Sequence, residues 1–369
     1  MTPRPDWAAH VERDLGFSFH TIAGEPYWDE TACYRFSEAQ VDTLDDATNE
    51  LEQLCLAAVE RVVSEGCYDR LAIPEPARAA IERSWKTQER NIYGRFDLRY
   101  DGRDPPKLLE YNADTPTALF EAAVVQWDWL EAHWPERDQF NSIHEKLIDA
   151  WGRFGIGRQT VHFSSVKGHG EDEGTVEYLR DTAVQAGLKT ERVAIEDIGW
   201  DGRQFIDLSG HTIDVLFKLY PWEWLVHEEF GPHLLSGAVK VIEPAWKLVL
   251  SNKAILAILW EMAEGHPNLL PTAFDPGAIA GRVVRKPIFG REGANVEVRD
   301  GDTVVQSVPG SYGAEGFVYQ AYAGLPSFAG NYPVIGSWII ASQAAGIGIR
   351  EDANEITTNA SRFVPHYIG

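Results

Sequence analysis

The sequence has 369 residues, of which 44% are hydrophobic and 24% are charged, which suits two or three domains with a large core and excludes a disordered chain. Lys and Arg number 33 against 56 Asp and Glu, and the formal net charge of -23 argues against nucleic acids and anionic membrane surfaces as partners. No apolar run approaches the roughly 18 residues of a membrane helix, and the amino-terminal stretch lacks the apolar segment of a signal peptide, so we expect a cytoplasmic protein.

The first predicted elements are a long helix and a hairpin. Apolar residues recur at helical spacing over 37–65, where Ser37 suits the N-cap and Gly66 the stop. Residues 92–112 predict two strands joined by a turn at 101–106. We expect the helix to be structural, because its repeating positions are apolar.

A second helix is predicted directly after the hairpin. Thr115 suits the N-cap and Pro116 the first helical position, and apolar residues continue to Trp129. A helix that begins here would aim its free N–H groups at the polar face of the hairpin, where Thr115 and Thr117 could contact an anionic substrate. As an ordinary cap Thr115 needs no such role, so both interpretations stay open.

Residues 160–219 predict a parallel α/β unit. Its expected elements are a strand at 161–166, a helix from about 175 to 185, and strands at 191–198 and 213–220. No GxGxxG motif is present, so we do not expect a dinucleotide site. An acidic loop containing Glu171 and Asp172 follows the first strand, and it is either a solvated turn or a substrate edge that binds an ammonium group.

After Pro244 the pattern becomes that of an antiparallel α+β region. A helix is predicted over 251–262, capped by Ser251 or Asn252. Strands are predicted at 281–289, 295–300, 317–323 and 337–343. The fold class is therefore α/β in one part of the chain and α+β in another.

Two pairs of polar residues share the predicted hairpin. Because residues two apart lie on one face of a strand, Arg95 and Asp97 point the same way, as do Glu110 and Asn112. Pairing of the strands would gather two carboxylates, an amide oxygen and a guanidinium, and hard oxygen ligands of this kind suit Mg²⁺. The alternative is an exposed hairpin with cross-strand ion pairs.

Basic residues in the last third of the chain suggest a phosphate site. Lys253 is expected in the first turn of its helix, where a cation is unfavourable unless a negative group lies nearby. Lys286 lies in an apolar strand, and buried lysines are rare unless paired. The loop Gly290–Gly293 follows and is either a simple hairpin turn or a lid whose backbone N–H groups meet phosphates. Arg350, after an apolar strand and two glycines, is either a phosphate clamp in a cleft or half of a surface salt bridge.

Together these segments resemble the synthetase domain of the glutathionylspermidine synthase family, a group of ATP-grasp ligases. The matching stretches run in order along nearly the whole chain: RFDLRYD, LEYNADTPTALFEAAVVQW, FKLYPWEW, EPAWKLVLSNKAILAILW, RKPIFGREGANV, GFVYQAYAGLP and GIGIREDANEITTNASRFVPH. Metal ligands precede the nucleotide lysines, as in the permuted ATP-grasp fold of eukaryotic glutathione synthetases. The resemblance implies a helical region with the metal-ligand hairpin at 1–150, a Rossmann-like pre-ATP-grasp substrate domain at 151–245, and a nucleotide-binding ATP-grasp region with a glycine-rich lid at 246–369.

The resemblance also implies roles for individual residues. The magnesium ligands would be Asp97, Glu110 and Asn112, with Glu292 as a further candidate. The ATP-binding residues would be Arg95, Lys253, Lys286, Gly290, Gly293, Gln320, Tyr322 and Arg350, of which Arg95 and Arg350 would also be catalytic. The residues that we expect to contact substrate are Thr115, Thr117, Glu171 and Asp172.

The implied activity is that of a carboxylate–amine ligase that uses ATP and Mg²⁺, forms an acyl-phosphate, and releases ADP and phosphate. Its partners would be a small-molecule carboxylate, including a peptide or thiol peptide, and an amine. The chain resembles the stand-alone synthetases, because 369 residues leave no room for the amidase domain of the bifunctional members. Arg362 stands where an acid would suit a polyamine, which favours an anionic or zwitterionic partner. The alternative is a nucleotide-binding regulatory or scaffold protein without ligase turnover, although no metal ligand or lysine of the family has been lost.

Overall fold

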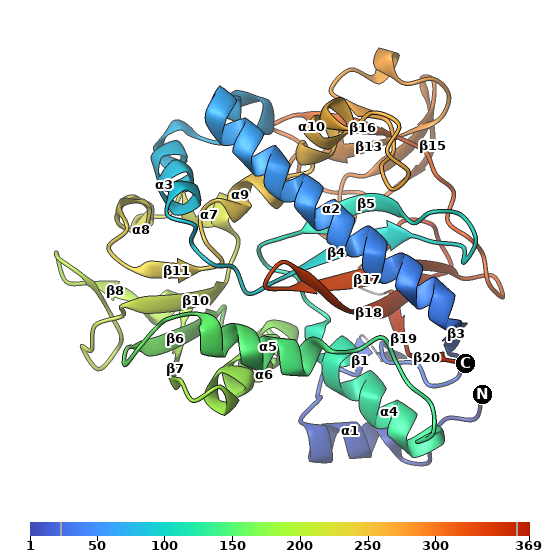
Figure 1. Ribbon diagram of the computed structural model, residues 1–369, viewed down its shortest axis with the longest axis horizontal. Coiled ribbons are helices and arrows are strands. Elements are labelled where there is room, and N and C mark those ends of the chain that lie inside the picture. The colour runs from blue at the N-terminus through green and yellow to red at the C-terminus, as the bar shows by residue number, and fades with distance from the viewer. Residues whose placement is uncertain (23, 359–360) are drawn as a thin grey trace.

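The fold is described from a computed structural model of the chain (Figure 1), which covers residues 1–22, 24–358 and 361–369. Residues 359 and 360, in the last of the matching stretches, lie outside the described residues. Two five-stranded sheets and one four-stranded sheet organise the described ranges. Within those ranges no helix is both long enough and apolar enough to cross a membrane.

The central five-stranded sheet joins early and late parts of the chain. It is antiparallel, with the order β19 (Arg362–Val364), β18 (Gln343–Asp352), β17 (Tyr332–Ile340), β4 (Tyr93–Arg99) and β5 (Lys107–Asn112). The strands β4 and β5 confirm the predicted hairpin, and their register sets Arg95 opposite Asn112 and Asp97 opposite Glu110. The hairpin is therefore an internal part of the body and not an appendage.

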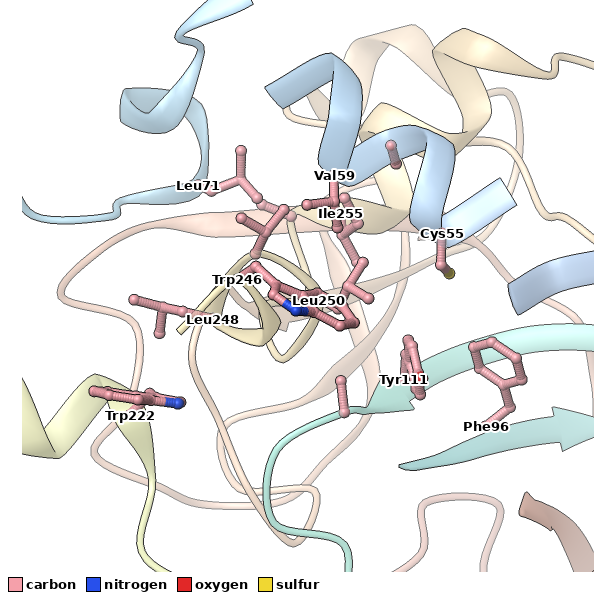
Figure 2. Close-up of a cluster of buried hydrophobic side chains, with 14 of the residues drawn as sticks. Cys55, Val59, Leu71, Phe96, Tyr111, Trp222, Trp246, Leu248, Leu250 and Ile255 are labelled. Carbon is pink, nitrogen blue, oxygen red and sulfur yellow. The ribbon is translucent and has the colours of Figure 1, made fainter. Parts of the chain in front are cut away.

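The predicted long helix is confirmed as α2 (Glu38–Glu65), which runs across the central sheet in Figure 1. Ser37 caps it in a capping box with Gln40, and Gly66 ends it in the left-handed conformation. One face of the helix is buried against the hairpin and two later helices, α9 (Lys247–Leu250) and α10 (Ile255–Met262). Figure 2 shows this core, in which Cys55 and Val59 lie above Phe96, Tyr111 and Leu250.

The four-stranded sheet is parallel, as predicted for residues 160–219. Its order is β11 (Lys240–Ile242), β10 (Val215–Leu219), β6 (Thr160–Ser165) and β7 (Lys189–Ala194). The connection from β6 to β7 is α6 (Gly170–Gln185), which packs on α5 (Ile143–Arg153). The prediction that Glu171 and Asp172 lie in a loop is wrong. They form the first turn of α6, where acidic side chains interact favourably with the helix dipole.

A second antiparallel sheet follows, with the order β12 (Thr272–Ala273), β16 (Phe317–Ala321), β13 (Val283–Pro287), β14 (Glu297–Asp300) and β15 (Thr303–Ser307). The helix expected over 251–262 begins only at Ile255. The Asn252 side chain accepts a hydrogen bond from the Ala254 N–H at 2.9 Å, which holds the preceding residues in a turn. Lys253 therefore precedes the helix, and its backbone N–H donates to the Ile288 carbonyl oxygen.

The predicted start of the next helix at Thr115 is wrong. Helical structure begins at Leu119, directly after Ala118, whose positive φ of 64° places it in the left-handed region. The Thr117 carbonyl oxygen accepts from Arg95 at 2.6 Å, which ties this segment to the hairpin. The elements that follow are the π-helical turn η2 (Glu121–Val125) and α4 (Gln126–His133).

Shorter elements complete the described chain. The amino-terminal β3 (Tyr34–Phe36) pairs in parallel with the carboxyl-terminal β20 (His366–Ile368). The remaining α-helices are α1 (Trp7–Leu15), α3 (Glu75–Lys86), α7 (Trp222–Leu225) and α8 (Gly231–Ser236). The 3₁₀ turns are η1 (Tyr68–Leu71), η3 (Ile195–Asp197) and η4 (Pro276–Ala278). Two small antiparallel pairs are β1 (Thr21–Ile22) with β2 (Glu25–Pro26), and β8 (Gly199–Trp200) with β9 (Phe205–Ile206).

Candidate active site

Two adjoining pockets lie around the hairpin of β4 and β5. The first pocket, of about 860 Å³, lies between the hairpin, the second antiparallel sheet and a loop at 355–357. The second pocket, of about 1130 Å³, lies between the hairpin, the segment 115–117 and the carboxyl-terminal edge of the parallel sheet. Both are lined by Glu110, Arg291, Gly293 and Thr357. The two pockets therefore meet at the hairpin.

Every residue predicted for the site lines one of these pockets. The first pocket is lined by Asp97, Glu110, Lys253, Lys286, Gly290, Gly293, Gln320 and Tyr322. The second pocket is lined by Arg95, Glu110, Asn112, Thr115, Thr117, Glu171, Asp172, Glu292, Gly293 and Arg350. The chain thus gathers the predicted residues in one joined space, and the role of each remains a prediction.

The polar face of the hairpin forms a compact network. Nε of Arg95 donates to Oδ1 of Asp97 at 2.7 Å, and Nη2 of Arg350 lies 3.4 Å from Oδ2 of Asp97. Nδ2 of Asn112 donates to Oδ2 of Asp97 and to Oε1 of Glu110, each at 3.3 Å. Because Arg95 and Asp97 are buried, this is not the exposed hairpin of the alternative interpretation. Two guanidinium groups share one carboxylate, so positive charge remains directed at the second pocket.

Two lysines stand on the first-pocket side of Glu110. Nζ of Lys253 lies 3.1 Å from Oε2 of Glu110 and donates to the Gly290 carbonyl oxygen at 2.6 Å. Nζ of Lys286 donates to the Leu109 carbonyl oxygen and to Oε1 of Gln320, both at 2.7 Å. Lys286 is 7% exposed, and its burial lowers its pKa to about 8, with Lys253 adding to the shift and Glu110 opposing it.

The carboxyl group of Glu110 is held ionised by these neighbours. Its burial alone would raise its pKa, but attraction to Lys253 and Lys286 holds the pKa well below its usual range. Glu110 is thus an anion at neutral pH, and the two lysines would retain a positive charge between them for a further anion.

The hairpin can hold a magnesium ion only with help from other ligands. Among the described residues, no three or more His, Cys, Asp and Glu side chains are placed to bind a metal by themselves. The hairpin offers two carboxylates and one amide, and the Asn112 amide already contacts both carboxylates. A half-turn of that amide would direct its oxygen to the same point. Mg²⁺ usually keeps waters and takes phosphate oxygens beside one or two carboxylates, so Asp97, Glu110 and Asn112 fit an ion that arrives with phosphates.

The loop Gly290–Gly293 closes the first pocket from one side. Gly293 has a φ of 70°, and a Cβ there would lie 2.6 Å from the Thr357 carbonyl oxygen. Only glycine allows this backbone conformation with so close an approach. The loop therefore meets the loop at 355–357 across the mouth of the pocket.

Arg291, at the centre of that loop, reaches into the wall of the second pocket. Its Nη1 donates to Oγ1 of Thr115 at 2.8 Å, and its Nη2 donates to Oε1 of Glu223 at 2.9 Å. Its guanidinium carbon lies 5.4 Å from the centre of the Trp224 ring. The sequence prediction did not include Arg291, although it lies between two predicted glycines. Glu223 and Trp224 were also missed, and the only sign of them was their place in the stretch FKLYPWEW.

The far end of the first pocket is apolar. Its walls include Val284, Val296, Val298, Leu325 and Ile356. Nε2 of Gln320 donates to the Leu108 carbonyl oxygen at 3.1 Å, so Gln320 joins β16 to the hairpin and orients Lys286. The Tyr322 hydroxyl donates to Oε2 of Glu355 at 2.5 Å across the pocket mouth. This end suits a flat apolar ring.

The acidic side of the second pocket is formed by the first turn of α6. Burial raises the pKa of Asp172 to about 6, and repulsion from Glu171 and Glu292 adds to the shift while His169 and Arg291 oppose it. Glu292 has a φ of 55° and lines the second pocket, as do the predicted magnesium ligands Glu110 and Asn112, whereas Asp97 lines the first.

The sequence argument from Arg362 is wrong. Nη1 of Arg362 lies 2.6 Å from Oδ2 of Asp29, and its Nη2 lies 2.6 Å from Oε1 of Glu351. Its charge is therefore neutralised within the protein. Since Glu351 alternates with Arg350 along β18, this group lies on the face of the sheet opposite to the pockets.

Glu121 is a buried acid that the sequence prediction missed. It lies in η2 and is 2% exposed. Burial raises the pKa of Glu121 to about 7, and repulsion from Glu171 adds to the shift while Arg350 opposes it. π-Helical turns often occur at functional sites, and an acid in the apolar stretch TALFEAAVV was the signal in the sequence.

The chain is similar to several known proteins along most of its length. The chain matches the family model described as glutathionylspermidine synthase pre-ATP-grasp over residues 1–369. It is 44% identical to a Haemophilus influenzae protein provisionally named an acid–amine ligase, across 99% of this chain and 97% of that protein. It is 29% identical to the trypanothione synthetase of Crithidia fasciculata, across 85% of this chain and 53% of that protein. It is 28% identical to the bifunctional glutathionylspermidine synthetase/amidase of Escherichia coli K12, across 90% of this chain and 58% of that protein.

The fold also occurs in a solved structure of low sequence identity. The apo form of a glutathione synthetase-like effector from Globodera pallida matches 91% of this chain and 89% of its own, with a TM-score of 0.54 and 11% identity. This similarity supports the mixed α/β fold alone. From the family match across its whole length, the chain belongs to the glutathionylspermidine synthase pre-ATP-grasp family.

Proposed function

We propose that this protein joins a small-molecule carboxylate to an amine in a reaction that consumes ATP, requires Mg²⁺, and releases ADP and phosphate. The observation that carries the proposal is the junction of the two pockets at Glu110, which contacts Lys253 on one side and Asn112 on the other. A nucleotide in the first pocket and a carboxylate in the second would meet at this point. The relatives named as an acid–amine ligase and as synthetases support the same class.

The first pocket suits ATP. Its apolar end would take the adenine ring beside Gln320 and Tyr322, and Lys253 and Lys286 would neutralise phosphates. The backbone of the loop Gly290–Gly293 would cover them. The residues that would hold Mg²⁺ are Asp97, Glu110 and Asn112, which hydrogen bonds join on the hairpin, with Glu292 as a further candidate from the loop. The ion, when bound, would neutralise charge on the phosphates.

The second pocket suits the two reacting substrates. A carboxylate oxygen, positioned by Thr115 and Thr117, would attack the γ-phosphorus while Arg95 and Arg350 stabilise the charge of the transferred group. The bond to ADP breaks and an acyl-phosphate forms. An amine held near Glu171 and Asp172 would lose its proton to a carboxylate and attack the carbonyl carbon, and phosphate then leaves.

The acyl-phosphate must be protected from water. The loop Gly290–Gly293 lies over the junction, and Arg291 joins it to Thr115 and Glu223 on the other side of the second pocket. A closed loop of this kind would exclude water from the intermediate.

The finer description of the fold belongs to the same proposal. In a permuted ATP-grasp order, residues 1–150 would supply the metal-ligand hairpin, 151–245 a Rossmann-like substrate domain, and 246–369 the nucleotide-binding region. The order of Asp97 before Lys253 and Lys286 in the chain supports this assignment, as does the pairing of β4 with β17.

The direct test is nucleotide product analysis with purified protein, Mg²⁺ and ATP. Carboxylates (glutathione, other short peptides and amino acids) would be crossed with amines, polyamines included, and Glu110→Ala would serve as the inactive control. ADP release that requires one carboxylate and one amine supports the ligase and identifies its substrates. Binding of ATP without ADP release from any pair, or release of AMP, contradicts the proposal, and the first of these results favours a nucleotide-binding regulatory protein.

A further inference from the structure

A third cavity, of about 1000 Å³, lies beside the second pocket at the carboxyl-terminal edge of the parallel sheet. Its lining includes the residues that directly follow three parallel strands, namely Val166 after β6, Ile195 after β7 and Tyr220 after β10. Val166 and Tyr220 also line the second pocket. The two cavities therefore share a wall, and we name this cavity the side compartment.

The topology of the parallel sheet favours ligand binding at this position. The chain leaves β6 through α6 to β7 on one side, whereas β10 pairs with β6 on the other side. The loops after β6 and β10 consequently diverge, and such switch points are where open α/β sheets bind their ligands. Val166 and Tyr220 stand at the two sides of this switch point.

The walls of the side compartment are mainly apolar. They are formed by Ile195, Ile198, Phe205, Leu225, Phe230 and Leu234. An alkyl or aryl group that enters would leave water, and each buried methylene strengthens binding about fourfold. A charge placed among these side chains would lose its hydration without a partner.

The charged groups of the side compartment are all acidic. They are Glu196, Glu228 and Glu229, and of the described residues that line the compartment none is Lys, Arg or His. The Tyr220 hydroxyl donates to Oε1 of Glu228 at 2.7 Å, and the Lys167 N–H donates to Oε1 of Glu196 at 3.2 Å, which orients both carboxylates. These charges favour a cation near the compartment and disfavour a molecule that carries its own carboxylate.

We propose that the side compartment binds the apolar part of the amine substrate, which is a primary amine with an alkyl or aryl group and no negative charge. This proposal rests on the ligase activity proposed above. The amino group would remain in the second pocket near the junction, and the apolar group would extend past Val166 and Tyr220. A linear polyamine suits the compartment less well, because most of the wall is apolar and only the three glutamates could pair with its additional ammonium groups.

The test begins with binding, which requires no turnover. Propylamine, hexylamine, phenethylamine, phenylalanine and spermidine would be titrated into the wild-type protein by isothermal calorimetry. We expect hexylamine and phenethylamine to bind at least tenfold more tightly than propylamine and more tightly than phenylalanine or spermidine. Equal affinity for propylamine and hexylamine, or tightest binding of spermidine, overturns the proposal.

Two variants locate the site. Ile198→Trp places a large ring in the compartment, whereas Leu208→Trp adds the same ring on the surface, where Leu208 is 78% exposed. The preference for hexylamine over propylamine should disappear in Ile198→Trp and persist in Leu208→Trp. If Ile198→Trp does not fold, Phe230→Ala removes a wall and should weaken hexylamine binding several-fold. Persistence of the preference in a folded wall variant overturns the proposal.

A charge variant tests the acidic side chains. Glu229→Gln should reduce the difference in binding affinity between phenethylamine and phenylalanine, because it removes a negative charge that repels the carboxylate of phenylalanine. Glu136→Gln, at an exposed position outside the compartment, should leave this difference unchanged. An unchanged difference in affinity in both Glu229→Gln and Glu228→Gln counts against the charge argument.

The two proposals can fail separately. If the binding results hold but no amine supports ADP release, the compartment stands and the ligase proposal fails. If an amine supports ADP release but the length of its alkyl chain has no effect, the ligase proposal stands and the compartment proposal fails.

Discussion

The two pockets at the hairpin differ in the arrangement of their charges. In the first pocket, acids and bases are in contact, as Glu110 is with Lys253, and Lys286 lies close enough to lower the pKa of Glu110. In the second pocket two arginines contact the Asp97 carboxylate, and a further acid lies on a different element. The guanidinium groups of Arg95 and Arg350 lie at the hairpin, whereas Asp172 lies at the start of α6 with a raised pKa of about 6.

This difference matches what each pocket would have to do. A pocket for a polyphosphate needs cations that are already positioned, and an internal carboxylate can hold them until the ligand arrives. A pocket for an ammonium and a carboxylate needs opposite charges at opposite ends, with an acid able to accept a proton near neutral pH. The predictions that follow separate these two kinds of electrostatics.

The largest expected effect comes from Glu110, which belongs to both pockets. Glu110→Ala removes an anion from between two lysines and also removes one of the predicted magnesium ligands. The rate of ADP release should therefore fall about a thousandfold. The matched control is Glu82→Ala, which breaks a contact with Lys86 of similar length, 3.0 Å, on an exposed helix face. Full activity in a folded Glu110→Ala protein would remove this residue from the reaction.

A stability effect is expected from Glu121, which lies close enough to Glu171 and Arg350 of the second pocket for their charges to influence its pKa. Glu121 has a pKa raised from 4.5 to about 7, so the folded state retains a proton that the unfolded chain releases in this range. Stability should therefore fall as pH rises from about 4.5 to about 7, by about 3 kcal/mol in total. Glu121→Gln cannot ionise and should lack this loss.

The measurement is urea denaturation of both proteins at pH 5 and pH 8. Between pH 5 and pH 8 the difference in unfolding free energy between Glu121→Gln and wild type should change in favour of the variant by about 2.5 kcal/mol. The matched control is Glu52→Gln, which alters a second buried acid, one that accepts from the Tyr111 hydroxyl at 2.9 Å. A difference that does not change with pH would mean that Glu121 is ionised throughout this range.

A smaller effect is expected from Lys286 on nucleotide affinity. Lys286→Ala removes a charged donor from the first pocket and should weaken ATP binding about 10- to 100-fold. Equilibrium binding measured with Mg²⁺ checks this. Gln320→Ala leaves the charge but removes one acceptor of Lys286, so it should have a weaker effect. Unchanged affinity in Lys286→Ala would exclude a phosphate role.

Local patterns allowed the sequence to predict the hairpin and the long helix. The alternation of Arg95 with Asp97 and of Glu110 with Asn112 fixes which residues share a face, and a short connection brings the strands together. The capping residues Ser37 and Gly66 similarly act within a single turn. The gathering of these side chains around one space was thus accessible from the sequence.

Contacts between distant segments explain what the sequence could not predict. The segment at Thr115 is not helical because Arg95 binds the Thr117 carbonyl and Arg291 binds the Thr115 hydroxyl, and these contacts override local helix preference. The neutralisation of Arg362 depends on Asp29, more than 300 residues away in the chain. No local pattern contains this information.

The smallest expected effect is the uptake of less than one proton when ATP binds in the first pocket. The pKa of Lys286 is lowered to about 8, chiefly by burial, so at pH 8 about half of the molecules carry the proton. Phosphates placed next to Nζ would raise this pKa, and ATP binding should therefore take up about half a proton at pH 8. Calorimetry in buffers of different ionisation enthalpy measures the uptake, and Lys286→Ala should abolish it. A lysine that remained fully charged before binding would give no dependence on the buffer, and the idea that burial, opposed by Glu110, tunes the first pocket for a polyanion would then be wrong.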